Sequence, residues 1–281
     1  MAEKEKIPKP LEAFLIILGG FVVTILASQA FILLLSPQAD KAVQSSFVFK
    51  SLIILGELGL GLVPFFYLKL KRYPVKELFR WNPIPSQIFW ISLPLGISLG
   101  IVGDELDRLI SLIIPSPEIL NELTSSMKVH SGSELIMMVL GVVIIAAVAE
   151  ESIIRGMLQI SMEKHHNVTR AVIYSSLAWT FIHGIIYWAL QIFLLGVVLG
   201  YLAWRTNSIW PSVICHAVNN GLALLFYNVN VTESLSVYEW KGHVSPLFFV
   251  PALVTLFYTL RYLDSYYRAF SISSSSNGDR E

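Results

Sequence analysis

The sequence predicts an all-α polytopic membrane protein with about eight transmembrane helices. Of its 281 residues, 54% are hydrophobic and only 14% are charged, and the mean hydropathy is +0.64. A soluble domain carries roughly 25% charged residues. The formal net charge is 0, so the charge gives no reason to expect a nucleic-acid partner. The expected partner is the lipid bilayer.

Apolar residues form eight runs that approach the length of a membrane span, which is about 20 residues. The first run is too long for the apolar core of a signal peptide, roughly 7–15 residues, so it is predicted to be a retained span. The eight candidate spans are 11–36, 47–68, 87–103, 134–160, 172–183, 185–204, 209–228 and 246–263. Residues 1–263 are therefore predicted to form one transmembrane domain, and the polar, Ser-rich residues 264–281 a disordered cytoplasmic tail.

The distribution of Lys and Arg predicts the orientation, because cytoplasmic loops carry an excess of both. With eight spans and both termini in the cytoplasm, 15 of the 20 Lys and Arg residues fall on the cytoplasmic side. The sequence thus predicts an integral membrane protein with cytoplasmic N- and C-termini.

Polar residues in three of the apolar runs are the main functional signal. Glu150 lies in the fourth run, His183 in the fifth and His216 in the seventh. Counted from the cytoplasmic ends of their helices, they lie at depths of roughly 20, 20 and 14 Å. Ionisable groups at membrane depth are costly and usually mark a pathway or a reaction centre. Their similar depth predicts one shared polar cavity, open to the cytoplasmic side.

Local spacing divides these polar residues by role. Glu151 and Arg155 are four residues apart on one helix, which favours a structural ion pair. Glu150 points about 100° away from Glu151 and is left free to face the cavity. His216 and Asn220 are also four residues apart, so they share one helix face.

These residue types are suited to hydrolysis. A buried glutamate is suited to act as a general base, and a histidine relays a proton. A second histidine and an amide donate hydrogen bonds to a developing oxyanion. The chain has no H-E-x-x-H and no G-x-S-x-G sequence, so the commonest zinc and serine protease motifs are missing.

Three short motifs resemble those of the CAAX protease and bacteriocin-processing family, which includes the type II CAAX prenyl endopeptidases. The motif E-E-x-x-x-R is present from Glu150 to Arg155, and H-x-x-x-N from His216 to Asn220. The motif F-x-x-x-H is matched by Trp179 to His183, with Trp in place of Phe. The resemblance covers about residues 134–227, the motif-bearing core of what would be a transmembrane protease domain.

The resemblance implies an intramembrane endopeptidase. Glu150 would activate water together with His183, His216 and Asn220 would stabilise the oxyanion, and Glu151 and Arg155 would support the site. The substrate would be a peptide or the C-terminus of a prenylated protein, from which the last three residues are released.

Two alternatives remain at this stage. In a zinc-dependent protease, Glu150, His183 and His216 would be metal ligands. No cofactor is favoured, because zinc prefers His, Cys and carboxylate ligands to Asn. In a non-enzymatic transporter or scaffold, the same cluster would bind an ion or serve packing.

Overall fold

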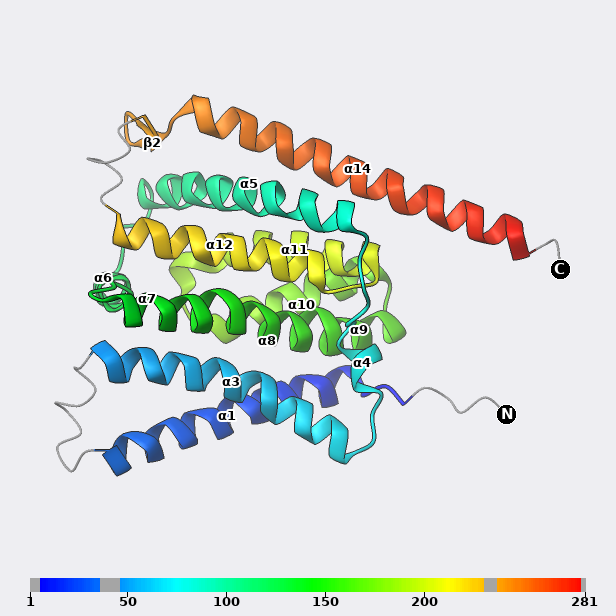
Figure 1. Cartoon of the computed structure of the whole chain (residues 1–281), viewed down its shortest axis with the longest axis horizontal. Helices are drawn as coiled ribbons and strands as arrows, with labels where there is room; N and C mark the ends of the chain where they lie inside the picture. The colour runs from blue at the N-terminus through cyan, green and yellow to red at the C-terminus, as the bar shows by residue number, and fades with distance from the viewer. Residues whose placement is uncertain (1–5, 36–45, 230–236, 279–281) are drawn as a thin grey trace.

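The computed structural model of the chain describes residues 6–35, 46–229 and 237–278. Long helices lying side by side make up most of it (Figure 1). Their bounds are α1 Pro10–Leu35, α3 Ser46–Leu70, α5 Ser86–Ser111, α10 Val168–His183, α11 Ala189–Thr206, α12 Trp210–Asn228 and α14 Pro246–Gly278. The shorter elements are α4 Val75–Leu78, α6 Glu118–Ser126 and a 3₁₀ turn, Ile186–Trp188.

A rod of 34 residues, Gly132–His165, runs through the bundle. It consists of α7 Gly132–Met138, α8 Ala146–Glu151 and α9 Gln159–His165, joined by the π-helical segments Val139–Ile145 and Ser152–Leu158. A π-helical turn holds one extra residue, so it rotates the side chains that follow it and often occurs at functional sites. The two adjacent glutamates of α8 lie between these segments.

Six of the described helices are long and apolar enough to cross a membrane. They agree with six of the eight predicted spans and identify the chain as an integral membrane protein. The other two predicted spans are helices α10 and α12. With 16 residues, α10 is shorter than the about 20 that a span needs. Helix α12 has 19 residues and carries His216, Asn219 and Asn220.

Small residues bring neighbouring helices into close contact, as is common in membrane proteins. Gly96 and Gly100 lie one turn apart on α5 and face α12. A Cβ atom on Gly96 would lie 2.8 Å from Val218 Cβ and 3.0 Å from Cys215 Cα. The backbones of α5 and α12 therefore approach more closely than side chains would allow, and the two helices run parallel through the bundle (Figure 1).

The bundle has two distinct ends. We call the end where α1 begins and α14 finishes the terminal end, and the opposite end, which carries α6, the α6 end (Figure 1). A hairpin of β1 Glu239–Trp240 and β2 His243–Val244 lies at the α6 end. Its two-residue turn has φ +54° at Lys241 and +84° at Gly242, as a tight hairpin turn requires.

Side chains of α5 hold this hairpin in place. Arg108 donates to Glu239 Oε2 at 3.3 Å, and Glu105 accepts the backbone N–H of Val244 at 2.7 Å. Tyr238 donates its hydroxyl to Asp104 at 3.0 Å. Burial, followed by the nearby Asp104 carboxylate, raises the pKa of the Tyr238 hydroxyl.

The predicted disordered tail at 264–281 is wrong in where it begins. Helix α14 continues to Gly278, past the end of the apolar run. Asp264 explains part of this extension, because its carboxylate binds Arg205 of α11 at 2.9 Å and Arg268 of α14 at 2.7 Å. These ion pairs connect α14 to the bundle where hydropathy alone predicted its end.

Candidate active site

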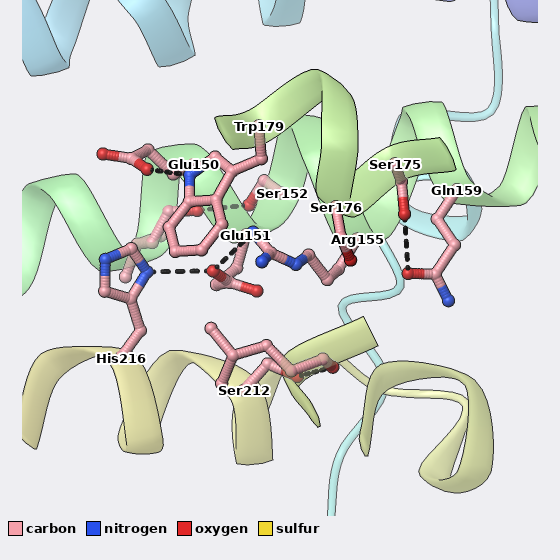
Figure 2. Close-up of polar contacts among 12 residues, drawn as sticks. Glu150, Glu151, Ser152, Arg155, Gln159, Ser175, Ser176, Trp179, Ser212 and His216 are labelled. Atoms are coloured by element: carbon pink, nitrogen blue, oxygen red, sulfur yellow. Dashed lines mark hydrogen bonds and ion pairs between the residues drawn. The ribbon is translucent and has the colours of Figure 1, made fainter. Parts of the chain in front are cut away.

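Glu150 lies at the centre of the bundle, on α8, and its side chain is buried. The indole N–H of Trp179, from α10, donates a hydrogen bond to its Oε2 atom (Figure 2). In the sequence, Trp179 is only a departure from the phenylalanine of the motif. Phenylalanine has no such donor. The substitution therefore adds a direct polar contact to the expected catalytic glutamate.

Beneath this contact is a fully buried ionic layer. Arg155 Nη1 donates to Glu151 Oε1 at 3.1 Å, so the predicted ion pair is present. The same oxygen accepts a hydrogen bond from His216 Nδ1 at 2.9 Å (Figure 2). The guanidinium of Arg155 lies 4.1 Å from the centre of the Trp179 ring, a cation–π contact. Glu151 thus orients His216, a role that local spacing did not reveal.

His183 is the last residue of α10. The helix ends there because Gly184 adopts φ +67°, a left-handed conformation that suits glycine at a helix C-terminus. His183 Nδ1 lies 2.9 Å from the carbonyl oxygen of Trp179, so Nδ1 carries the proton of this hydrogen bond. In the neutral ring Nε2 is then an acceptor, 4.0 Å from Glu150 Oε2.

Asn220 lies one turn beyond His216 on α12. Its Nδ2 donates to the carbonyl oxygen of Val142 at 2.9 Å, within the first π-helical segment. An amide has two N–H groups, so this bond occupies one and leaves the other. Asn220 therefore links α12 to the central rod in addition to lining the cavity.

A cavity of about 500 Å³ is lined by all four residues that the sequence predicted to be catalytic. From Glu150 and His216 it continues along α5, past Asp104 and Ser111, to Asn121 of α6. Asn121 belongs to α6, so the cavity extends to the α6 end of the bundle. This end lies opposite to the start of α1 (Figure 1).

The end at which the cavity opens differs from the prediction. The sequence predicts a cavity on the same side as both termini, and the structure has it at the opposite end. The depth of Glu150 in its helix could not predict on which side the cavity opens, because Glu150 is close to the middle of its 34-residue rod. The side on which the cavity opens depends on where α10 ends. This helix ends at His183 and does not cover the cavity beyond that residue.

A second, smaller cavity of about 140 Å³ shares Glu150, Trp179 and His183 with the first. Glu57 of α3 also lines it, and its Oε2 atom is buried without a hydrogen-bond partner among the described residues. Glu57 is not among the site residues that the sequence predicted. The available signal was a single carboxylate within the apolar run 47–68.

The zinc alternative requires three ligands to converge. Among residues 6–35, 46–229 and 237–278, no group of three His, Cys, Asp or Glu side chains is arranged to hold a metal ion. Glu150, His183 and His216 lie on one cavity. His216 directs Nδ1 toward Glu151 and His183 directs Nδ1 toward a backbone carbonyl, so Nε2 is the remaining nitrogen of each ring.

Comparison with known families supports the resemblance that the three motifs suggested. Residues 132–222 match the family model described as type II CAAX prenyl endopeptidase Rce1-like. This range contains all the predicted site residues and most of the motif-bearing core. No curated protein and no solved structure matches the chain significantly.

Proposed function

Because residues 132–222 carry an Rce1-like domain, we propose that this chain is an intramembrane endopeptidase that uses water activated by Glu150. The observation that carries the proposal is the pair of Glu150 and His183, whose facing atoms are 4.0 Å apart. A water molecule about 2.8 Å from each atom fits between them. One O–H of that water would donate to the carboxylate and the other to Nε2 of His183.

In the proposed reaction the water oxygen attacks the carbonyl carbon of the scissile peptide bond as Glu150 takes the water proton. The C–N bond then breaks, and Glu150 returns the proton to the leaving amine. His183 Nε2 accepts the second O–H of the water. This hydrogen bond orients a lone pair of the water oxygen toward the carbonyl carbon.

The oxyanion would be stabilised by His216 and Asn220. His216 already donates Nδ1–H to Glu151, so its Nε2 is a donor only when the ring is protonated. The carboxylate of Glu151 fixes the direction of the ring. Asn220 would contribute the N–H that it does not use for Val142.

The substrate class that the family description suggests is a membrane-tethered peptide, of which a prenylated C-terminus is one form. The two cavities that meet at Glu150 support a substrate with a polar and an apolar part. The larger one is lined by Asp104, Asp107 and Asn121, among others. The smaller one includes Phe21, Leu60 and Ile182.

The test is cleavage by the purified protein in lipid bilayers or detergent. We expect the wild type to cleave a farnesylated C-a-a-X peptide carrying a fluorophore and a quencher, and Glu150→Gln to lose cleavage. Glu118→Gln is the matched control, since Glu118 is exposed at the start of α6. Cleavage by Glu150→Gln at the wild-type rate would refute the proposal.

The same assay tests for a metal. We expect chelators to leave the rate unchanged, because the described residues contain no group of three His, Cys, Asp or Glu side chains arranged to hold a metal ion. Inactivation by a chelator with recovery on adding Zn²⁺ would replace the metal-free mechanism with a zinc-dependent one and would leave the protease activity standing.

A further inference from the structure

The larger cavity carries charge of one sign. Three carboxylates line it, those of Asp104, Asp107 and Glu150. Among the described residues, no Lys or Arg lines this cavity. Its two histidines, His183 and His216, belong to the proposed reacting centre around Glu150. Away from that centre the cavity is lined by acidic and uncharged side chains, so an anionic group would find no cation there.

Asp104 and Asp107 lie one turn apart on α5, but only the first has its charge compensated. The Asp104 carboxylate pairs with Arg108 at 3.2 Å and accepts the hydroxyl of Tyr238 at 3.0 Å. Arg108 also donates to Glu239 of the hairpin at 3.3 Å. The guanidinium of Arg108 is therefore bound between α5 and the hairpin, and it neutralises Asp104.

Asp107 has no comparable partner. Its Oδ1 atom is buried and makes no hydrogen bond to any described residue. Arg108 acts on the carboxylate only through space. The other groups that interact with it are the indole of Trp188 and the hydroxyls of Tyr187 and Tyr227, and all three are uncharged. Carboxylates attract cations, and so do the faces of Trp and Tyr rings, so these surroundings favour a cationic group over an anionic one.

The place of Asp107 along α5 relates it to the expected scissile bond. On the same helix, Gly96 contacts Cys215 and Gly100 contacts Asn219, which are the sequence neighbours of the two expected oxyanion residues of α12. Asp107 lies 7 and 11 residues beyond these two glycines, roughly 10 to 16 Å further toward the α6 end. An extended peptide rises about 3.3 Å per residue, so about three to five residues would cover this distance.

From these observations we infer that Asp107 selects peptides with a basic side chain about three to five residues from the scissile bond. A Lys or Arg side chain at that place would bring its charge to the Asp107 carboxylate, whereas an Asp or Glu side chain would meet a like charge. The inference rests on the proposed protease function and names its substrate class, which is a cationic peptide segment. Asp107 is a specificity-determining residue in this account and takes no part in the hydrolysis itself.

Peptides that differ in one residue test this selectivity. Each contains the farnesylated C-a-a-X sequence and carries Lys, Gln or Glu about four residues from the scissile bond. The test residue precedes the bond in one series and follows it, in an extended C-terminus, in the other. In at least one series we expect kcat/KM of the Lys peptide to exceed that of the Glu peptide by about tenfold, with the Gln peptide between them. Equal values for all peptides, or the reverse order, would overturn the inference.

Two variants identify the residue responsible. Asp107→Asn keeps the shape of the side chain and removes its charge, so the ratio of kcat/KM between the Lys and Glu peptides should fall to near one. Glu122→Gln removes one charge at the same end of the bundle, from an exposed residue of α6 that is not among those lining the cavity. This control should keep the wild-type ratio. A tenfold preference that survives in Asp107→Asn would overturn the role of Asp107.

Binding to the variant Glu150→Gln separates this inference from the protease function, because that variant is expected to bind peptides without cleaving them. We expect fluorescence anisotropy to show tighter binding of the Lys peptide than of the Glu peptide, with a difference that decreases as salt is added. If the wild type cleaves none of the peptides while Glu150→Gln binds the Lys peptide more tightly, the protease function fails and the selectivity stands. Equal affinities for the Lys and Glu peptides would overturn the selectivity whether or not the wild type cleaves them.

Discussion

Trp179 and Glu150 belong to different helices and are joined by a hydrogen bond from the indole N–H to the carboxylate. The same indole ring lies over Arg155, whose guanidinium binds Glu151. One aromatic side chain thus separates the two adjacent glutamates into two environments. Glu150 faces the cavity, and Glu151 is enclosed in an ion pair.

Replacing Trp179 by Phe would remove the donor and keep an aromatic ring over Arg155. A hydrogen bond to a charged group is worth about 1.5–3 kcal/mol. We expect kcat to fall by about tenfold, which corresponds to about 1.4 kcal/mol, because the carboxylate loses the bond that fixes its direction. KM should change little. Trp90→Phe is the control, since Trp90 is 65% exposed on α5. An unchanged kcat for Trp179→Phe would show that the bond does not contribute to catalysis.

Replacing Arg155 by Ala should destabilise the fold. The variant leaves Glu151 buried with His216 as its remaining partner, and it removes the contact with Trp179. Removing one partner of a buried ion pair costs about 3–5 kcal/mol. We expect a clearly lower melting temperature in detergent than for Arg170→Ala, which alters an exposed arginine of α10. Equal melting temperatures for the two variants would contradict a structural role for the pair.

Asn220→Ala separates two functions of one amide. Losing one oxyanion donor typically lowers kcat by about 10²–10³-fold. Losing the bond to Val142 should cost about 1 kcal/mol of stability. The control is Asn228→Ala, since the Asn228 amide donates to backbone carbonyls at the α6 end, outside the cavity. If Asn220→Ala lowered the melting temperature and left kcat unchanged, the amide would be only a link between helices.

Glu57→Leu should raise stability and lower activity. The Oε2 atom of Glu57 is buried without a partner among the described residues, and such a group costs about 1–3 kcal/mol. Leucine removes that cost. We expect a higher melting temperature and a lower kcat, because Glu57 lies on the same cavity as Glu150 and His183. The Glu57→Gln variant preserves the shape and tests the charge alone. Wild-type kcat in both variants would remove Glu57 from the site.

The sequence predicted features that depend on neighbours along the chain. Apolar runs reproduced six spans, and the spacing of four residues gave the ion pair of Glu151 and Arg155. The sequence could not predict the contacts between helices. The bonds of Trp179 to Glu150 and of His216 to Glu151 depend on how α10 and α12 turn toward the central rod, which no local pattern records.

Three other differences have local causes that hydropathy does not measure. The π-helical segments on either side of Glu150 rotate the side chains that follow them along the rod. Their sequences are as apolar as that of an ordinary helix, so hydropathy does not reveal them. The extension of α14 to Gly278 is accompanied by ion pairs of Asp264, in a stretch that composition assigned to disorder. The open side of the cavity follows from the end of α10 at Gly184, a glycine whose conformation the sequence did not reveal.

The early end of α10 also affects the surrounding bilayer. Its 16 residues span roughly 24 Å, less than the about 30 Å of a typical hydrocarbon core. A helix shorter than the membrane is accommodated when lipids around it thin the bilayer, at a cost that grows with the mismatch. The lipids beside Phe181 and Ile186 would therefore be compressed, and the headgroup region would lie closer to Glu150 there than elsewhere around the bundle. Acyl-chain length would then control hydrolysis, with faster turnover in thin membranes than in thick ones.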